Sequence, residues 1–140
     1  MKIVPQKVEY VDLAYLAGSM EADGCWFVGN SVSMRLTNKS IRLLQWCVDT
    51  FGGNIKSKSN PVDCFEWTLH GQTAVSLTKQ LIPYLHSKEE EVSFWLQYGN
   101  TIQTRGKRLS ADTCSERLDL KNKVTQARKR RNGENCQSIS

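Results

Sequence analysis

The sequence LAGSMEADG, residues 16–24, stands where the chain changes from a helical to an extended pattern. Before it, apolar side chains recur at the spacing of one helix face and predict a helix over residues 8–22. The members of that face are Leu13, Leu16, Ala17 and Met20. Gly24 is expected to end the helix, because glycine can take a positive φ. A strand is predicted to follow directly.

Two hairpins are predicted downstream of this stretch. Apolar and polar side chains alternate over residues 25–38, and Gly29-Asn30 gives a turn between the two runs. A similar pattern over residues 54–59 and 64–70 predicts the second hairpin. Each hairpin has one apolar and one polar face.

Helical spacing returns between and after the hairpins. Residues 40–51 and 73–85 carry apolar stripes at that spacing, and Gly52-Gly53 is expected to end the first of these helices. Another helix is predicted to begin at Ser87, which forms a capping-box pattern with Glu90.

This order of elements predicts an α+β fold, an αββαββα unit whose hairpins form a four-stranded antiparallel sheet. Helices cover one face of the sheet and leave the other face open. An open face of donors, acceptors and cations can read a DNA groove, and an ordinary solvated sheet face is the alternative. The polar side chains expected on this face are Ser31, Ser33, Arg35, Lys56, Lys58, Glu66, Thr68 and His70.

The positive charge of the chain is concentrated at its C-terminal end. Of the net charge of +5, residues 1–104 contribute −1 and residues 105–140 contribute +6. We expect one domain over residues 1–104 and a basic extension over residues 105–140, partly helical or disordered, whose charge favours a polyanionic partner. Its residues 126–140 are expected to fray. A solvated tail that only keeps the protein soluble is the alternative.

Cysteine usage and hydropathy indicate the environment of the protein. The five cysteines are scattered and form no CxxC pair, which excludes a zinc ribbon or a disulfide scaffold and predicts a reducing, intracellular compartment. We expect the cytoplasm of a bacterium or of a phage host, or an organelle. No apolar run approaches the length of a membrane span, so no membrane partner is expected.

Residues 16–24 resemble the signature motif of the LAGLIDADG homing endonucleases. Six of the nine positions are identical, Glu21 replaces the first aspartate of the motif, and Ser19-Met20 replaces two aliphatic residues. The motif also stands at the end of a predicted helix and directly before a strand, as the family requires. The resemblance covers about residues 9–104 and is to the single-motif, homodimeric branch.

The resemblance implies a homodimer built around the first helix. Ala14 and Gly18 lie one turn apart and form, with Glu21, a small face that a second copy of the helix can approach across a two-fold axis. The two Asp23 carboxylates then meet at the dimer centre. Together with the main-chain carbonyl of Ala22 they are ligands suited to Mg²⁺ or Mn²⁺. A packed core helix with an ordinary turn at its end is the alternative.

Three further catalytic residues follow from the resemblance. Asn38 takes the place of a polar residue, usually glutamine, that positions solvent near the metal. Arg42 takes that of a basic residue that stabilises phosphate charge, and Lys88 falls on the active-site lysine. The alternatives are a helix cap for Asn38, a solvated charge for Arg42 and an ion pair within the helix for Lys88.

The DNA-binding residues implied by the resemblance include the polar sheet residues named above, together with Phe27 and Lys39. The hairpin over residues 25–38 is shorter than in most of the family, which predicts fewer base contacts at the outer edge of the DNA site.

The sequence therefore predicts a homodimeric, Mg²⁺-dependent endonuclease that serves intron homing. It is expected to cut both strands of a long, roughly palindromic double-stranded DNA site by phosphodiester hydrolysis. The alternative is a maturase that binds intron RNA and assists splicing, or a non-cleaving DNA-binding protein on the same scaffold. Asp23 argues against both, because a pure binder has no need for an acidic residue beside phosphate. An unrelated small α+β binding protein would require every match to be accidental.

Overall fold

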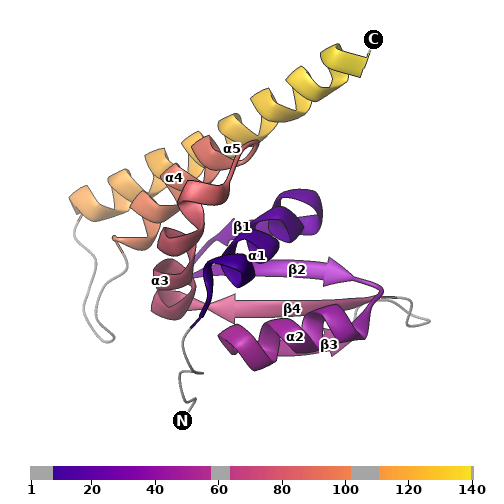
Figure 1. Ribbon diagram of the computed structural model, residues 1–140. Coiled ribbons are helices and arrows are strands. Elements are labelled where there is room, and N and C mark those ends of the chain that lie inside the picture. The colour runs from indigo at the N-terminus through magenta and orange to yellow at the C-terminus, as the bar shows by residue number, and fades with distance from the viewer. Residues whose placement is uncertain (1–7, 58–63, 102–110, 140) are drawn as a thin grey trace.

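A four-stranded antiparallel sheet with strand order β1-β2-β4-β3 forms the centre of the fold (Figure 1). The computed structural model describes residues 8–57, 64–101 and 111–139. The strands are β1 (Gly24–Val28), β2 (Val32–Asn38), β3 (Asn54–Ser57) and β4 (Phe65–His70). The predicted hairpin over residues 25–38 and the α+β class are confirmed, and the two hairpins join through β2 and β4.

Helices precede, separate and follow the hairpins in the order that the sequence predicts. They are α1 (Tyr10–Asp23), α2 (Ile41–Phe51), α3 (Gly71–Leu81), the 3₁₀ helix η1 (Ile82–Tyr84), α4 (Glu89–Gly99) and α5 (Ala111–Ile139). Gly52 and Gly53 end α2 with φ values of 89° and 95°, as expected. None of the helices in the described ranges combines the length and the apolar character needed to cross a membrane.

The main core lies between the sheet and the helices α1, α2 and α3. Trp26, Met34 and Trp67 project from the strands into it and are fully buried. The indole N–H of Trp26 donates to the hydroxyl of Thr78 on α3 over 3.0 Å, so the polar end of this buried ring has a partner. This packing fixes the position of α1 over β1 and β2, and with it the end of the LAGSMEADG motif (Figure 1).

The outer edge of β1 is covered by side chains from α4 and α5. Trp95 donates to the carbonyl of Phe27 over 2.9 Å, Tyr98 to that of Gly29 over 2.6 Å, and Arg128 to that of Trp26 over 2.9 Å. An exposed strand edge is a template for unwanted pairing, and these contacts cover it.

The C-terminal helix α5 corrects one expectation. It is continuous to Ile139, although the sequence predicted fraying over residues 126–140. It lies along α4 (Figure 1), and Leu120 and Val124 join the main core. Few apolar residues follow Val124 on this face of α5, because Arg128 and Arg131 make its next polar contacts.

Two predicted helix ends also differ. Gly24 has a φ of −98° and is the first residue of β1, so a positive φ is not the reason for glycine there. A Cβ atom at Gly24 would lie 2.6 Å from the Sδ atom of Met20, so close packing is the constraint. The capping box at Ser87 and Glu90 does not form. Lys88 is the N-cap of α4, and its side chain makes no capping hydrogen bond to the helix.

Candidate active site and nucleic-acid interface

The C-terminal end of α1 is where the predicted catalytic residues converge. Asp23 is the last residue of α1 and is exposed. The side-chain amide of Asn38, at the end of β2, donates to the Asp23 carboxylate over 3.3 Å. The amide oxygen of Asn38 accepts the N–H of Ser40 over 2.8 Å, and Ser40 caps α2. The junction of β2 and α2 thus orients the Asp23 carboxylate.

Lys88 binds the same end of α1. Its ammonium donates to the carbonyls of Met20 and Gly24 over 3.0 and 2.7 Å, which lie on either side of Ala22 and Asp23. The last turn of α1 contains no basic residue, so this ammonium is the cation at the negative end of the helix dipole. Burial, and next the positive charge of Arg131, hold the pKa of Lys88 below its ordinary value.

Glu21 has a role that the sequence did not reveal. One oxygen of its carboxylate accepts the backbone N–H groups of His86, Ser87 and Lys88 over 2.5, 2.6 and 3.0 Å. Glu21 was expected in a dimer interface with Ala14 and Gly18, but its carboxylate is bound within the chain. It thereby ties the end of α1 to the segment that leads into α4.

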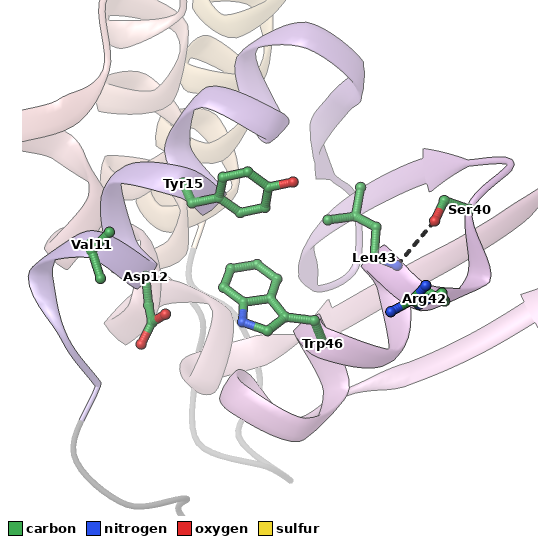
Figure 2. Close-up of a pocket in the computed structure, with 7 residues that line it drawn as sticks. All are labelled: Val11, Asp12, Tyr15, Ser40, Arg42, Leu43 and Trp46. Carbon is green, nitrogen blue, oxygen red and sulfur yellow. Dashed lines mark hydrogen bonds between the residues drawn. The ribbon is translucent and has the colours of Figure 1, made fainter.

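Arg42 lies in the first turn of α2, beside a depression between α1 and α2 (Figure 2). Tyr15 and Trp46 form the floor of this depression with their rings edge to face, 5.1 Å apart. Within the part of the chain that the structure describes, the Arg42 guanidinium makes no hydrogen bond or ion pair and is exposed. It is therefore free to bind an anion brought by a partner molecule.

One exposed face of α1 carries apolar and small residues. Val11 and Tyr15 are 71% and 56% exposed, and Ala14, Gly18 and Ala22 continue the same stripe toward Asp23. A Cβ atom at Gly18 would have no heavy atom within 4 Å. Packing inside the chain therefore does not require a small residue at Gly18.

The face of the sheet opposite α1, α2 and α3 gathers most of the predicted DNA-binding residues. The register aligns Phe27 with Ser33 and His70, and Arg35 with Thr68. The Arg35 guanidinium lies over the ring of Phe27, 4.3 Å from its centroid, and its buried Nε atom has no hydrogen-bond partner. An arginine stacked in this way is held in one orientation, with donors left for a ligand.

The same face is less open than the sequence predicted. Ser33, Glu66 and Thr68 are buried, because longer neighbours in the register stand around them. Lys56, for example, lies opposite Glu66, with 3.7 Å between its ammonium and the Glu66 carboxylate. The long side chains of this face, Phe27, Arg35, Lys56 and His70, therefore reach outward farthest.

The remaining predicted DNA-binding residues lie around this face. Ser31 is exposed in the turn between β1 and β2, and Lys39 is exposed directly after β2. Lys58 lies outside the described residues.

A single chain offers few ligands for a metal ion at this site. Among residues 8–57, 64–101 and 111–139, no group of three or more His, Cys, Asp or Glu side chains is arranged to hold one. The Asp23 carboxylate is nevertheless exposed and oriented. One carboxylate and one carbonyl per chain fit Mg²⁺, which is commonly held by one or two carboxylates and substrate phosphates.

Sequence reasoning missed a buried ionic cluster behind the site. Arg128 and Arg131 of α5 both pair with Glu91 of α4. The sequence contains one indication of these contacts. Arg128 and Arg131 lie on the same face of α5 as the buried residues Leu120, Val124 and Ala127.

We find no protein-family model and no curated protein that matches the sequence. Solved structures do match the fold. The homing endonuclease I-CvuI, in complex with a DNA target, superimposes with a TM-score of 0.71 at 20% identity, over 84% of this chain and 82% of that one. The archaeal intron-encoded homing endonuclease I-Vdi141I, complexed with DNA, has a TM-score of 0.73 at 14% identity, over 84% of each chain.

A third structure differs in length. The DNA-bound meganuclease I-SmaMI matches 79% of this chain but only 44% of its own, with a TM-score of 0.66 at 17% identity. The expected resemblance to homing endonucleases is thus confirmed for the fold of this chain.

Proposed function

We propose that this protein is a site-specific DNA endonuclease that acts as a homodimer with a divalent metal ion, Mg²⁺ or Mn²⁺. Its substrate is a long, roughly palindromic double-stranded DNA site, and its reaction is hydrolysis of one phosphodiester bond in each strand. The shared fold supports this proposal, because I-CvuI and I-Vdi141I are homing endonucleases in complexes with DNA.

One observation carries the proposal. The carboxylate of Asp23 is oriented by Asn38 and lies at a helix end that Lys88 also grips, and yet it remains exposed. A carboxylate that served only folding would gain nothing from this exposure. An oriented, accessible carboxylate with cations nearby is what metal-assisted phosphodiester hydrolysis requires.

The homodimer rests on the exposed stripe of α1. An isologous interface needs a self-complementary patch, and small residues at Ala14, Gly18 and Ala22 let two such helices approach closely. Because Asp23 ends the same helix, dimerisation through this stripe brings the carboxylates of both chains near the two-fold axis. Each chain then supplies half of the metal ligands, and the partner chain supplies those that one chain lacks.

At this centre the side chains divide the work. Asp23 and the carbonyl of Ala22 would hold the ion, and Asn38 fixes the orientation of the carboxylate. A bound ion would supply Lewis acidity for the phosphate and for an attacking water at this place. Lys88 keeps the end of α1 in place and adds positive charge close to the phosphate. Arg42 and Lys39 bind flanking phosphates.

The sheet face reads the DNA. A curved antiparallel sheet fits along the major groove, where base edges are distinguishable. The long outward side chains carry this role: Arg35 donates to guanine, Lys56 binds guanine or phosphate, and His70 gives an adaptable polar contact. Shorter buried residues such as Thr68 set the spacing of the long ones.

Digestion of a randomised DNA library tests the proposal. Duplexes with palindromic random half-sites are incubated with the protein and Mg²⁺, and the cut ends are sequenced, with the Asp23→Asn variant as the control. Symmetric cut sites that are absent from the control support the proposal. A protein that cuts nothing but protects intron RNA would instead support the splicing alternative.

A further inference from the structure

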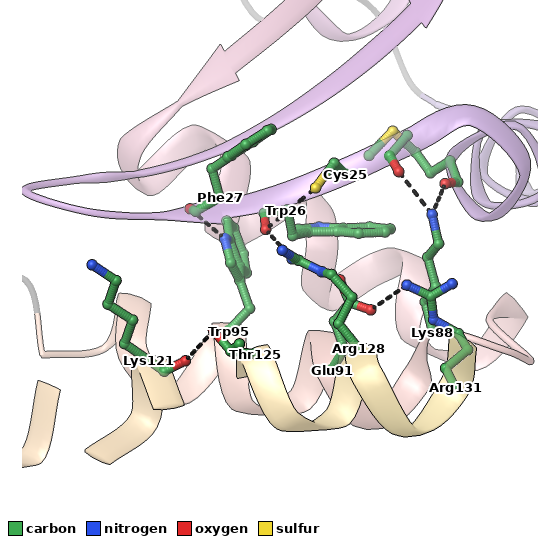
Figure 3. Close-up of polar contacts among 12 residues, drawn as sticks. Cys25, Trp26, Phe27, Lys88, Glu91, Trp95, Lys121, Thr125, Arg128 and Arg131 are labelled. Atoms are coloured by element: carbon green, nitrogen blue, oxygen red, sulfur yellow. Dashed lines mark hydrogen bonds and ion pairs between the residues drawn. The ribbon is translucent and has the colours of Figure 1, made fainter. Parts of the chain in front are cut away.

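The C-terminal helix α5 reaches the first turn of α4 through a buried ionic cluster. Glu91 is 2% exposed, and its carboxylate accepts Nε of Arg128 over 2.9 Å and a terminal nitrogen of Arg131 over 3.0 Å. Figure 3 shows the two arginines extending from α5 to Glu91. Arg128 also donates to the carbonyl of Trp26 on β1, so the cluster ties three elements together.

This cluster stands directly behind Lys88. Lys88 is the N-cap of α4, and Glu91 lies in the turn that follows. The backbone N–H of Lys88 is held by Glu21 over 3.0 Å, and its ammonium is held by the carbonyls of Met20 and Gly24. A single polar path therefore runs from α5, through the start of α4, to the end of α1 beside Asp23.

The burial of Glu91 makes both arginines necessary. A buried carboxylate that loses one partner keeps its desolvation cost without the compensating attraction, so the surrounding structure must shift or admit water. The adjacent pair, Arg130 with Glu90, provides a contrast on the same two helices. Its side chains are 54% and 58% exposed, and an ion pair in that position contributes little.

We propose that Arg128 and Arg131 are positioning residues for Lys88: by fixing Glu91 they hold the start of α4, and thereby the Lys88 ammonium, against the end of α1. The C-terminal helix is then part of the active-site scaffold. Its consequence for DNA cleavage rests on the proposed function, whereas its consequence for Lys88 does not.

The comparison of Arg131→Gln with Arg130→Gln tests this inference. Both variants remove one positive charge, one residue apart on α5, but only the first breaks the buried pair. Trace reductive methylation with formaldehyde, followed by mass spectrometry, measures the accessibility of Lys88. Lys88 is 7% exposed and is expected to be protected in the wild type, with the exposed Lys56 as the internal reference.

We expect the methylation of Lys88 in Arg131→Gln to rise toward that of Lys56, while Arg130→Gln leaves it unchanged. Single-turnover cleavage is expected to fall about tenfold in Arg131→Gln, as for other residues that hold a catalytic side chain, with an unchanged Kd for DNA. An Arg131→Lys variant keeps the positive charge but not the planar guanidinium. The methylation of Lys88 in this variant is expected to lie between those in Arg131→Gln and Arg130→Gln. The variant also serves if Arg131→Gln does not fold.

Equal methylation of Lys88 in the Arg131 and Arg130 variants would overturn the inference, whatever the cleavage result. If the wild type cuts no DNA but Lys88 loses its protection in Arg131→Gln, the inference stands and the proposed function fails. The two hypotheses are thus separated by two readouts of the same variants.

Discussion

The side-chain amide of Asn38 donates to the carboxylate of Asp23 across 3.3 Å, although 15 residues separate them in the chain. This bond joins the end of β2 to the end of α1, and Lys88 joins the start of α4 to the same place. Three elements thus meet at the end of α1, which carries one exposed carboxylate.

Gly18→Leu is expected to abolish the dimer without unfolding the chain. The position faces open space within one chain, so a leucine fits there, but it blocks a second helix from approaching. Sedimentation velocity measures the association state. Ser76→Leu, at an exposed position of α3, is the control for an added surface leucine. A dimer that persists in Gly18→Leu would place the interface elsewhere.

Arg35→Ala is expected to relax base specificity at one position of each half-site. The loss of a guanine contact costs about 1–3 kcal/mol of discrimination. Binding to singly substituted DNA sites in Ca²⁺ measures it. Lys79→Ala on α3, on the opposite side of the sheet, removes the same charge and is the control. If Arg35→Ala weakens binding to all sites equally while Lys79→Ala does not, Arg35 contacts only phosphate.

Lys88 is expected to lose its proton at a lower pH than exposed lysines. Burial lowers its pKa most and Arg131 lowers it further, whereas Glu91 raises it. Arg131→Gln should therefore raise the pKa of Lys88, and Glu91→Gln should lower it. NMR titration of ¹³C-labelled lysine, assigned with Lys88→Met, measures the three values. Shifts of the same sign in both variants would contradict the assignment.

The same pKa shift has a consequence for stability. The unfolded chain keeps the ordinary lysine pKa of about 10.4, and the folded chain has a lower one. Unfolding therefore takes up a proton between these two values. The contribution of Lys88 to the free energy of unfolding rises with pH across that window and is flat below it. Lys88→Met should remove this rise, as urea unfolding at several pH values can show.

Thr78→Val is expected to destabilise the fold by about 1–3 kcal/mol, because it leaves a buried donor without an acceptor. That donor is the indole N–H of Trp26, 3.0 Å from the Thr78 hydroxyl. Urea denaturation measures the free energy of unfolding. In a Trp26→Phe background the same change should cost less, because the donor is gone. An equal cost in both backgrounds would mean that the hydrogen bond contributes nothing.

Local patterns in the sequence were sufficient to predict most of the fold. The helical spacing of Leu13, Leu16 and Met20 defines the buried face of α1, and the alternation around Met34 defines β2. Both are short-range periodicities that follow directly from the geometry of one helix or one strand. The α+β class followed from their order along the chain.

What the sequence could not predict depends on contacts between distant elements. The carboxylate of Glu21 binds backbone N–H groups 65 to 67 residues away, and no local pattern announces such a bond. The buried ion pairs of α5 are made with Glu91, which lies on another helix. For Gly24 the positive φ predicted from the residue type was wrong. Glycine is required there because a larger side chain would collide with Met20.

The candidate site shows the same division. The resemblance implied the roles of Asp23, Asn38 and Lys88, and the structure brings these three residues to the same helix end. Arg42 lies instead beside the depression between α1 and α2. The burial of Ser33 and Thr68 was not foreseen, since alternation tells which face a residue takes but not how tall its neighbours are.

The most direct test of the account compares cleavage and binding by the wild type and Asp23→Asn on one DNA site recovered from the library. In Mg²⁺ the wild type should cut both strands, and the variant should be slower by more than about a hundredfold, because a metal ligand contributes more than the residues that hold it. Its Kd for the same DNA in Ca²⁺ should stay within a few-fold of the wild-type value. Cutting by Asp23→Asn at the wild-type rate would show that this carboxylate is not part of the reaction.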